Sequence, residues 1–192
     1  MMRKLIFVLL TLPATGLAAS PSFDCTKARS SAEELICADD ALAQLDTRMA
    51  QTYAQALSAA MDDADTLRAS QRGWIKGRDD CWKADDLRTC VRDAYLLREA
   101  DLVARWMLQA PLAVTAYICD GNPANEVTAY FYDTELPGVR LEYGDSIRTG
   151  ALVPTGSGSK YMTEWGGFIW IQGRDAQFSW VEGTQMSCVA TD

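Results

Sequence analysis

The sequence predicts an α+β protein organised as two domains, an N-terminal disulfide-stapled helical bundle and a C-terminal small antiparallel β-barrel of about eight strands. Residues 21–109 contain almost no glycine or proline and repeat apolar residues at helical spacing. Residues 112–192 instead consist of short strand-like runs separated by turn residues. The six cysteines are spaced so that two pairs of near neighbours can form in the first half and one pair can form across the second.

The N-terminus is typical of a secretory signal peptide. A positively charged start precedes the apolar run of residues 5–12, and small residues lie around positions 16–20. The run is shorter than the roughly 20 residues that cross a bilayer. A lipoprotein would need a cysteine directly after the small residues, whereas the first cysteine is Cys25. We therefore expect a signal peptide over residues 1–19, a periplasmic or secreted protein and no stable membrane anchor, with a retained N-terminal anchor as the alternative.

Helix starts are expected where capping residues precede apolar runs. Ser30 and Ser31 each lie three residues before a glutamate, and Asp39 and Asp86 precede the later runs. Residues expected to face the bundle core recur every three or four positions. They are Leu42, Leu45, Met49, Tyr53 and Leu57, then Leu67, Gln71, Trp74, Ile75 and Arg78, then Leu87, Val91, Ala94, Tyr95, Leu102 and Trp106. A partly buried guanidinium needs a carboxylate, so we expect Arg78 to pair with Asp46 across helices.

Strands are expected in the second half at runs rich in β-branched and aromatic residues. Clear examples are residues 113–118, 127–132, 139–143, 167–171 and 177–181. Short, evenly spaced strands favour a sheet that closes into a barrel, because closure removes exposed edges.

Export places the cysteines in an oxidising compartment, where they pair. Proximity favours Cys25–Cys37, Cys81–Cys90 and Cys119–Cys188, although sequence alone cannot choose the connectivity. The chain has no histidine and no C-x-x-C pair, so neither a metal site nor a cofactor is expected.

The net charge of −8 argues against nucleic acid and anionic lipid as partners and favours a basic protein. Plain solubility is the alternative reading of the charge. The absence of histidine removes the Ser-His-Asp and Cys-His systems, so we expect the protein not to be an enzyme. A carboxylate-based hydrolase using Asp120 or Glu164 is the remaining catalytic alternative. The sequence does not indicate the oligomeric state.

Two clusters in the helical half resemble the LprI-type N-terminal domain of secreted bacterial proteins. One contains Cys25, Glu33 and Cys37, and the other runs from Gln71 to Cys81 and on to Cys90 and Tyr95. The resemblance covers nearly all of residues 21–109. It implies an association with lysozyme inhibition in some members, without assigned contact residues.

The C-terminal half resembles the MliC/PliC family of periplasmic inhibitors of c-type lysozyme. The resemblance covers residues 112–192 and rests on the Ser-Gly-x-x-Tyr motif of residues 157–161, on Gly-x-x-Ala-x-Phe at residues 173–178, and on Cys119 and Cys188. In that family a loop serine and a lysine approach the catalytic cleft of the enzyme. Here the serine corresponds to Ser157, whereas Gln172 occupies the lysine position.

The resemblance implies a barrel that inserts the Ser157 loop into the cleft of a c-type lysozyme. The expected lysozyme-binding residues are Ser157, Gly158, Ser159, Lys160, Tyr161 and Gln172. Lys160 is a possible substitute cation if it points outward. Tyr161, Trp165 and Trp170 could anchor the rim of the contact, although strand aromatics more often belong to the barrel core, the stronger expectation for Trp170 and Trp180. The alternative function is an envelope binding module that recognises peptidoglycan fragments or another envelope protein.

Overall fold

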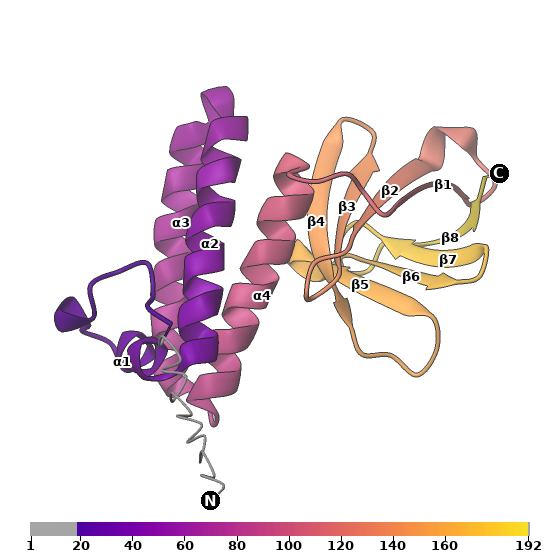
Figure 1. The fold of residues 1–192 in the computed structure, drawn as a ribbon. Helices are drawn as coiled ribbons and strands as arrows, with labels where there is room; N and C mark the ends of the chain where they lie inside the picture. Colours follow the sequence, from indigo (N-terminus) through magenta and orange to yellow (C-terminus); the bar gives the residue numbers. More distant parts are fainter. Residues whose placement is uncertain (1–18, 192) are drawn as a thin grey trace, which may run out of the picture.

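The computed structural model describes residues 19–191, so the expected signal peptide lies almost entirely outside the described residues. Helices make up the first half and strands the second, as predicted (Figure 1). The helices are α1 (Ser31–Ala38), α2 (Asp40–Ala59), α3 (Ala64–Asp79) and α4 (Leu87–Trp106). Only Asp39 separates α1 from α2, whereas short 3-10 turns join the later helices. Within residues 19–191, no helix combines the length and the apolar character needed to cross a membrane.

Three of the four helices begin at the capping residues that the sequence indicates. The Ser30 hydroxyl accepts from the Glu33 backbone N–H at 3.1 Å, and the Glu33 carboxylate accepts from the Ser30 N–H at 3.3 Å, which completes a capping box before α1. Asp39 and Asp86 accept backbone N–H groups at the starts of α2 and α4. Helix α3 has no side-chain cap and continues directly from a 3-10 turn, η2 (Met61–Asp63).

A buried network of polar side chains connects helices α2, α3 and α4 beside the apolar core of the bundle. Tyr95 donates to Asp46 at 2.7 Å, and Arg78 donates to the Tyr95 hydroxyl at 2.9 Å. The Ser22 backbone N–H and hydroxyl also donate to Asp46, each at 2.6 Å. Arg78 lies 3.7 Å from Asp46, so the expected cross-helix ion pair is confirmed. Burial, with a smaller contribution from Asp46, raises the pKa of Tyr95 far above its ordinary value and keeps the phenol protonated.

Eight antiparallel strands close into a barrel in which each strand pairs with its sequence neighbours and β1 pairs with β8. They are β1 (Ala113–Cys119), β2 (Glu126–Tyr132), β3 (Gly138–Tyr143), β4 (Ser146–Val153), β5 (Ser159–Thr163), β6 (Phe168–Gln172), β7 (Asp175–Ser179) and β8 (Gln185–Ala190). Cys119 lies opposite Cys188 across the closing pair, and the three disulfides are the ones that proximity favours.

The barrel interior is filled by side chains that alternate with outward-facing ones along each strand. Val127, Leu141, Ile169 and Phe178 are fully buried members of this core. Expected strand limits are wrong at two places. Residue 167 was expected inside a strand, but β6 begins at Phe168. Residue 181 was expected inside a strand, but β7 ends two residues earlier because the Ser179 hydroxyl donates to the Val181 carbonyl at 2.6 Å and turns the chain.

Helix α4 belongs to both halves, because one side packs on α2 and α3 while the other covers β2, β3 and β4 (Figure 1). Gly138, at the start of β3, lies so close to the Ala100 carbonyl that a side chain there would crowd it. Thr149 of β4 donates to Asp101 at 2.6 Å. Arg140 of β3 donates to the Arg105 carbonyl at 2.8 Å. These contacts fix the barrel on the bundle.

Candidate functional site

The connection between β4 and β5 forms a loop that extends past the strands it joins (Figure 1). Its tip, residues 154–158, is exposed and lies against the end of β6. The Trp170 indole N–H donates to the Ser157 carbonyl at 2.9 Å, and Thr155 donates to the same oxygen at 3.3 Å. The loop is therefore held by the Trp170 side chain of the neighbouring strand and by a bond within the loop.

Ser157 and Gln172 lie side by side at this tip, although fifteen residues separate them in the chain. The Gln172 amide Nε2 donates to the Ser157 hydroxyl oxygen at 3.1 Å, and both side chains are exposed. A hydroxyl has one proton and two acceptor lone pairs, so this bond uses only acceptor capacity. Within residues 19–191 no acceptor is found for the Ser157 hydroxyl proton. The proton can therefore be donated to a partner, as can the second N–H of the Gln172 amide.

Gly158 makes the close contact with β6 possible. Its φ is +65°, in the left-handed region that favours glycine. A Cβ at this position would also overlap the Ile171 carbonyl oxygen. Both the backbone conformation and the available space therefore require glycine, and the glycine lets the tip lie directly on the strand.

Lys160 points outward, as its suggested role requires. It pairs in register with Trp170, and its Nζ lies 4.4 Å from the centroid of the Phe168 ring and 5.7 Å from that of Trp170. These are cation–π contacts, which hold the ammonium group over the outer face of β6. Ser159 begins β5 and is exposed. Both residues lie at the same end of the barrel as Gln172, but alternation along β5 places their side chains on opposite faces.

Tyr161 does not lie on this surface. It is only 8% exposed and packs against Phe131 inside the barrel, with ring centroids 5.4 Å apart. Burial raises the pKa of its phenol. The expectation that Tyr161 contacts a partner is therefore corrected to a role in the barrel core, because alternation along β5 turns its side chain inward.

The other aromatic residues also divide between core and surface. Trp180 packs against the barrel core, as expected. Trp170 does not, because it lies on the outer face, between the inward Ile169 and Ile171, and pins the tip instead. Trp165 is 76% exposed, but it follows the far end of β5 and so lies at the opposite end of the barrel from Ser157. Trp165 is therefore not among the residues that surround the Ser157 tip.

Arg174 is a cation near the tip that the sequence motifs did not single out. It follows Gln172 in the turn between β6 and β7, and its Nη2 donates to the Ala190 carbonyl at 2.9 Å. Sequence spacing could have found it, because a two-residue turn brings position 174 to the same end of the barrel as Gln172.

The two acids considered for hydrolysis lie at the other end of the barrel from the Ser157 tip. The Asp120 carboxylate accepts the Ser187 backbone N–H at 3.0 Å, which links the end of β1 to β8. Glu164 begins the 3-10 turn η5 (Glu164–Gly166) and is exposed. The geometry gives Asp120 a structural role and gives Glu164 a place on the surface.

Two family models match this chain, one for each half. The model described as "Lysozyme inhibitor LprI" matches residues 25–110, and the MliC model, described as "Membrane-bound lysozyme-inhibitor of c-type lysozyme", matches residues 117–187. The first match covers the helices and the second covers the barrel, in the order that the motifs predicted. Both resemblances drawn from the sequence are confirmed.

Curated relatives agree with the first model. The chain is 34% identical over 149 residues to proteins named Lipoprotein LprI from Mycobacterium tuberculosis and Mycobacterium bovis. The alignment covers 77% of this chain and 74% of each relative, so it is longer than either half and extends into both.

Proposed function

The chain belongs to the LprI family of lysozyme inhibitors, and on that premise we propose that it is a periplasmic or secreted inhibitor of c-type lysozyme that inserts its Ser157 tip into the active-site cleft. Both family models that match it describe lysozyme inhibitors. The protein performs no catalysis in this proposal. The observation that carries the mechanism is the exposed pair of Ser157 and Gln172, which offers hydrogen-bond donors at the end of a pinned loop.

The chemistry of the target explains why donors are needed. Lysozyme uses two carboxyl groups that flank the scissile bond, about 5 Å apart in a retaining glycosidase. A small hydroxyl on a narrow loop fits between them and donates to a carboxylate oxygen. The Gln172 N–H already donates to the Ser157 oxygen, and this polarises the Ser157 O–H and strengthens its own donation. The second Gln172 N–H supplies another donor beside it.

The tip is also ordered before it binds. The Trp170 indole and the close contact of Gly158 with β6 hold it in one conformation. A preorganised loop loses little conformational entropy on binding, so more of the contact energy contributes to affinity.

Charge favours the encounter with such an enzyme. The full chain has a net charge of −8, and loss of residues 1–19, which include two basic residues and no acidic one, would make it more negative by two. C-type lysozymes are basic proteins, so attraction between opposite charges increases the association rate.

The Cys25–Cys37 disulfide bears on whether this chain can be attached to the envelope by a lipid. The relatives are named lipoproteins, whose anchor is carried by a cysteine sulfur. In this chain the sulfur of Cys25 is bonded to Cys37. A lipid on Cys25 and this disulfide are mutually exclusive, so we do not expect Cys25 to carry such an anchor.

The test is an inhibition assay on bacterial cell-wall suspensions with the purified protein, residues 20–192, against several c-type lysozymes. We expect inhibition at micromolar or lower protein, and a rise in the inhibition constant of at least about tenfold in Ser157→Ala, since loss of a hydrogen bond to a charged group costs about 1.5–3 kcal/mol. Ser146→Ala is the matched control, because Ser146 is an exposed serine at the opposite end of β4. No inhibition of any c-type lysozyme would contradict the function, and equal inhibition by both variants would contradict the mechanism.

A further inference from the structure

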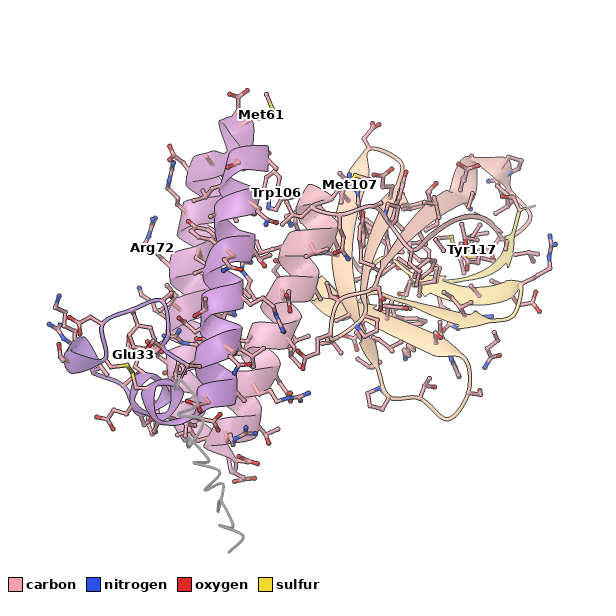
Figure 2. The ribbon with its side chains drawn as sticks, viewed as in Figure 1. Glu33, Met61, Arg72, Trp106, Met107 and Tyr117 are labelled. Carbon is pink, nitrogen blue, oxygen red and sulfur yellow. A yellow bond between two sulfur atoms is a disulfide. The ribbon has the colours of Figure 1, made fainter. Side chains whose placement is uncertain are left out.

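A cavity of about 590 Å³ lies between the helical bundle and the barrel, remote from the Ser157 tip. Helices α3 and α4 form one side, and residues of β3, β4 and η5 form the other. Its volume falls within the range of ordinary small-ligand sites. Part of the wall is apolar, with Leu67, Leu102, Trp106 and Ile147. Figure 2 shows Trp106 at the C-terminal end of α4, where that helix runs between the bundle and the barrel.

Arg98 lines this cavity with an incompletely paired guanidinium. The residue is 8% exposed, its Nε donates to Gln71 at 3.0 Å, and its Nη1 donates to Asp101 at 2.7 Å. Its Nη2 is buried and has no hydrogen-bond partner among residues 19–191. A buried donor without a partner is costly, so this position favours an added acceptor.

The same bundle contains a buried arginine that shows how the fold satisfies such a group. Every guanidinium nitrogen of Arg78 has a hydrogen-bond acceptor, supplied by Tyr95 and Asp79. Burial acts to lower the pKa of Arg78, but Tyr95 and Asp79 outweigh it and raise the value. For Arg98 burial prevails and lowers the pKa, with a further contribution from the neighbouring cation Arg105, although Asp101 opposes the change. Positive charge at Arg98 is therefore under-compensated.

A second cation and a second unpaired donor line the same cavity. The Arg105 guanidinium has one ion pair among the described residues, with Asp101 at 3.6 Å, so two arginines share one carboxylate. Arg98, Asp101 and Arg105 follow each other at three- and four-residue steps and so lie on one face of α4. The Trp106 indole N–H is buried and has no partner within residues 19–191. All of these unpaired groups are donors, which calls for a ligand with acceptor oxygens.

The rim of the cavity has the opposite character. Asp63 and Glu164 are exposed carboxylates, and Thr66 and Ser70 are exposed hydroxyls. These groups accept hydrogen bonds from hydroxyl or amide donors and disfavour a ligand that is anionic throughout. A ligand that fits has one carboxylate directed at the arginines and donor groups directed at the rim.

We propose that this cavity binds a small carboxylated sugar, whose carboxylate is held by Arg98 and Arg105 and whose hydroxyl groups face Asp63 and Glu164. A planar carboxylate matches the paired N–H groups of a guanidinium, and the apolar wall beside Trp106 accommodates a sugar ring. This site is separate from the tip that the proposed function uses.

The experiment is a calorimetric titration of the full mature chain with N-acetylmuramic acid and, as the matched ligand, N-acetylglucosamine, which lacks the lactyl carboxylate. We expect N-acetylmuramic acid to bind at least about tenfold more tightly. Arg105→Gln removes the less buried cation and is expected to weaken binding of N-acetylmuramic acid by about tenfold or more. Arg72→Gln is the control, because Arg72 is exposed on α3 and points away from the barrel (Figure 2).

Equal binding of the two sugars, or no binding of either at 10 mM, would overturn the proposal. So would an Arg105→Gln variant that binds N-acetylmuramic acid as well as Arg72→Gln does. Lysozyme inhibition measured in parallel separates the two sites, since we expect Arg105→Gln to inhibit as the unmodified chain does. A loss of inhibition in Ser157→Ala with sugar binding intact would support the same separation.

Discussion

Replacement of Gln172 by lysine should strengthen lysozyme inhibition, because position 172 lies beside the Ser157 hydroxyl at the exposed tip. The Gln172 amide that faces a lysozyme carboxylate already donates to a charged group. An ammonium in its place adds an opposite charge, and an exposed ion pair contributes about 0.2–1 kcal/mol. This corresponds to up to about a fivefold lower inhibition constant. The lysine Nζ can still donate to the Ser157 oxygen, so the tip keeps its support.

The added positive charge also weakens long-range attraction to a basic enzyme, and a control must remove this effect. Gln185→Lys makes the same charge change at the start of β8, at the other end of the barrel. Inhibition constants and association rates of both variants, measured at low and physiological salt, separate local contact from steering. If Gln172→Lys inhibits no better than Gln185→Lys, position 172 does not face the catalytic carboxylates and the proposed docking is wrong.

Three further predictions concern stability. Gly158→Ala should lower the free energy of unfolding by at least about 1–2 kcal/mol and weaken inhibition, because the left-handed backbone and the strand beside it exclude a side chain. Gly156→Ala, in open space with ordinary φ, should change urea denaturation little, and equal effects would contradict this account of the tip. Asp46→Asn should destabilise by about 1.5–3 kcal/mol, because it weakens the hydrogen bonds that Ser22 and Tyr95 donate to this buried carboxylate, while Asp79 still pairs with Arg78. Asp93→Asn on the surface should cost well under about 1 kcal/mol, and similar urea midpoints would show that the network contributes little. The pKa of Asp39 lies below its ordinary value because an arginine side chain and two backbone N–H groups donate to it, so the folded protein binds this proton less readily than the unfolded chain. Stability from Asp39 is therefore present above its unfolded pKa of 3.8 and is lost as the pH falls through the lower folded value. Asp39→Asn keeps a capping oxygen but should flatten the acid limb of the stability–pH curve, and an unchanged slope would refute the linkage.

Features that depend on neighbouring residues in the chain were predictable from the sequence. Capping at Ser30, Asp39 and Asp86 needs only a side-chain oxygen and backbone groups within three positions, and all three caps are present. The disulfides join cysteines that are near neighbours in the first half or lie at opposite ends of the second half.

The faces of individual strand residues were harder to predict. The run at β6, Phe-Ile-Trp-Ile, is apolar at every position, so it contains no alternation that could assign Trp170 to the outside. The burial of Tyr161 required the register of β5 against β6, which the sequence does not specify. Family resemblance marked Tyr161 correctly as part of the motif but not as a residue of the core.

The candidate site was predictable only in part, for the same reason. The motif located Ser157 and position 172, but their hydrogen bond depends on how the loop folds back on β6. The cavity beside Arg98 was not predictable at all, because it arises where α3 and α4 meet two strands of the barrel. No pattern among neighbouring residues in the sequence specifies how these helices pack against the barrel.

The shared helix α4 has a consequence for how large a footprint the molecule presents. Because α4 packs against both the bundle and the barrel, the two halves have a fixed relative position. An enzyme bound at the Ser157 loop would therefore lie at a fixed distance and angle from the helical half. A second contact between the bundle and the bound enzyme would form within the same complex, without the entropy cost of ordering a flexible linker. Even a weak contact of this kind would lengthen the residence time of the complex.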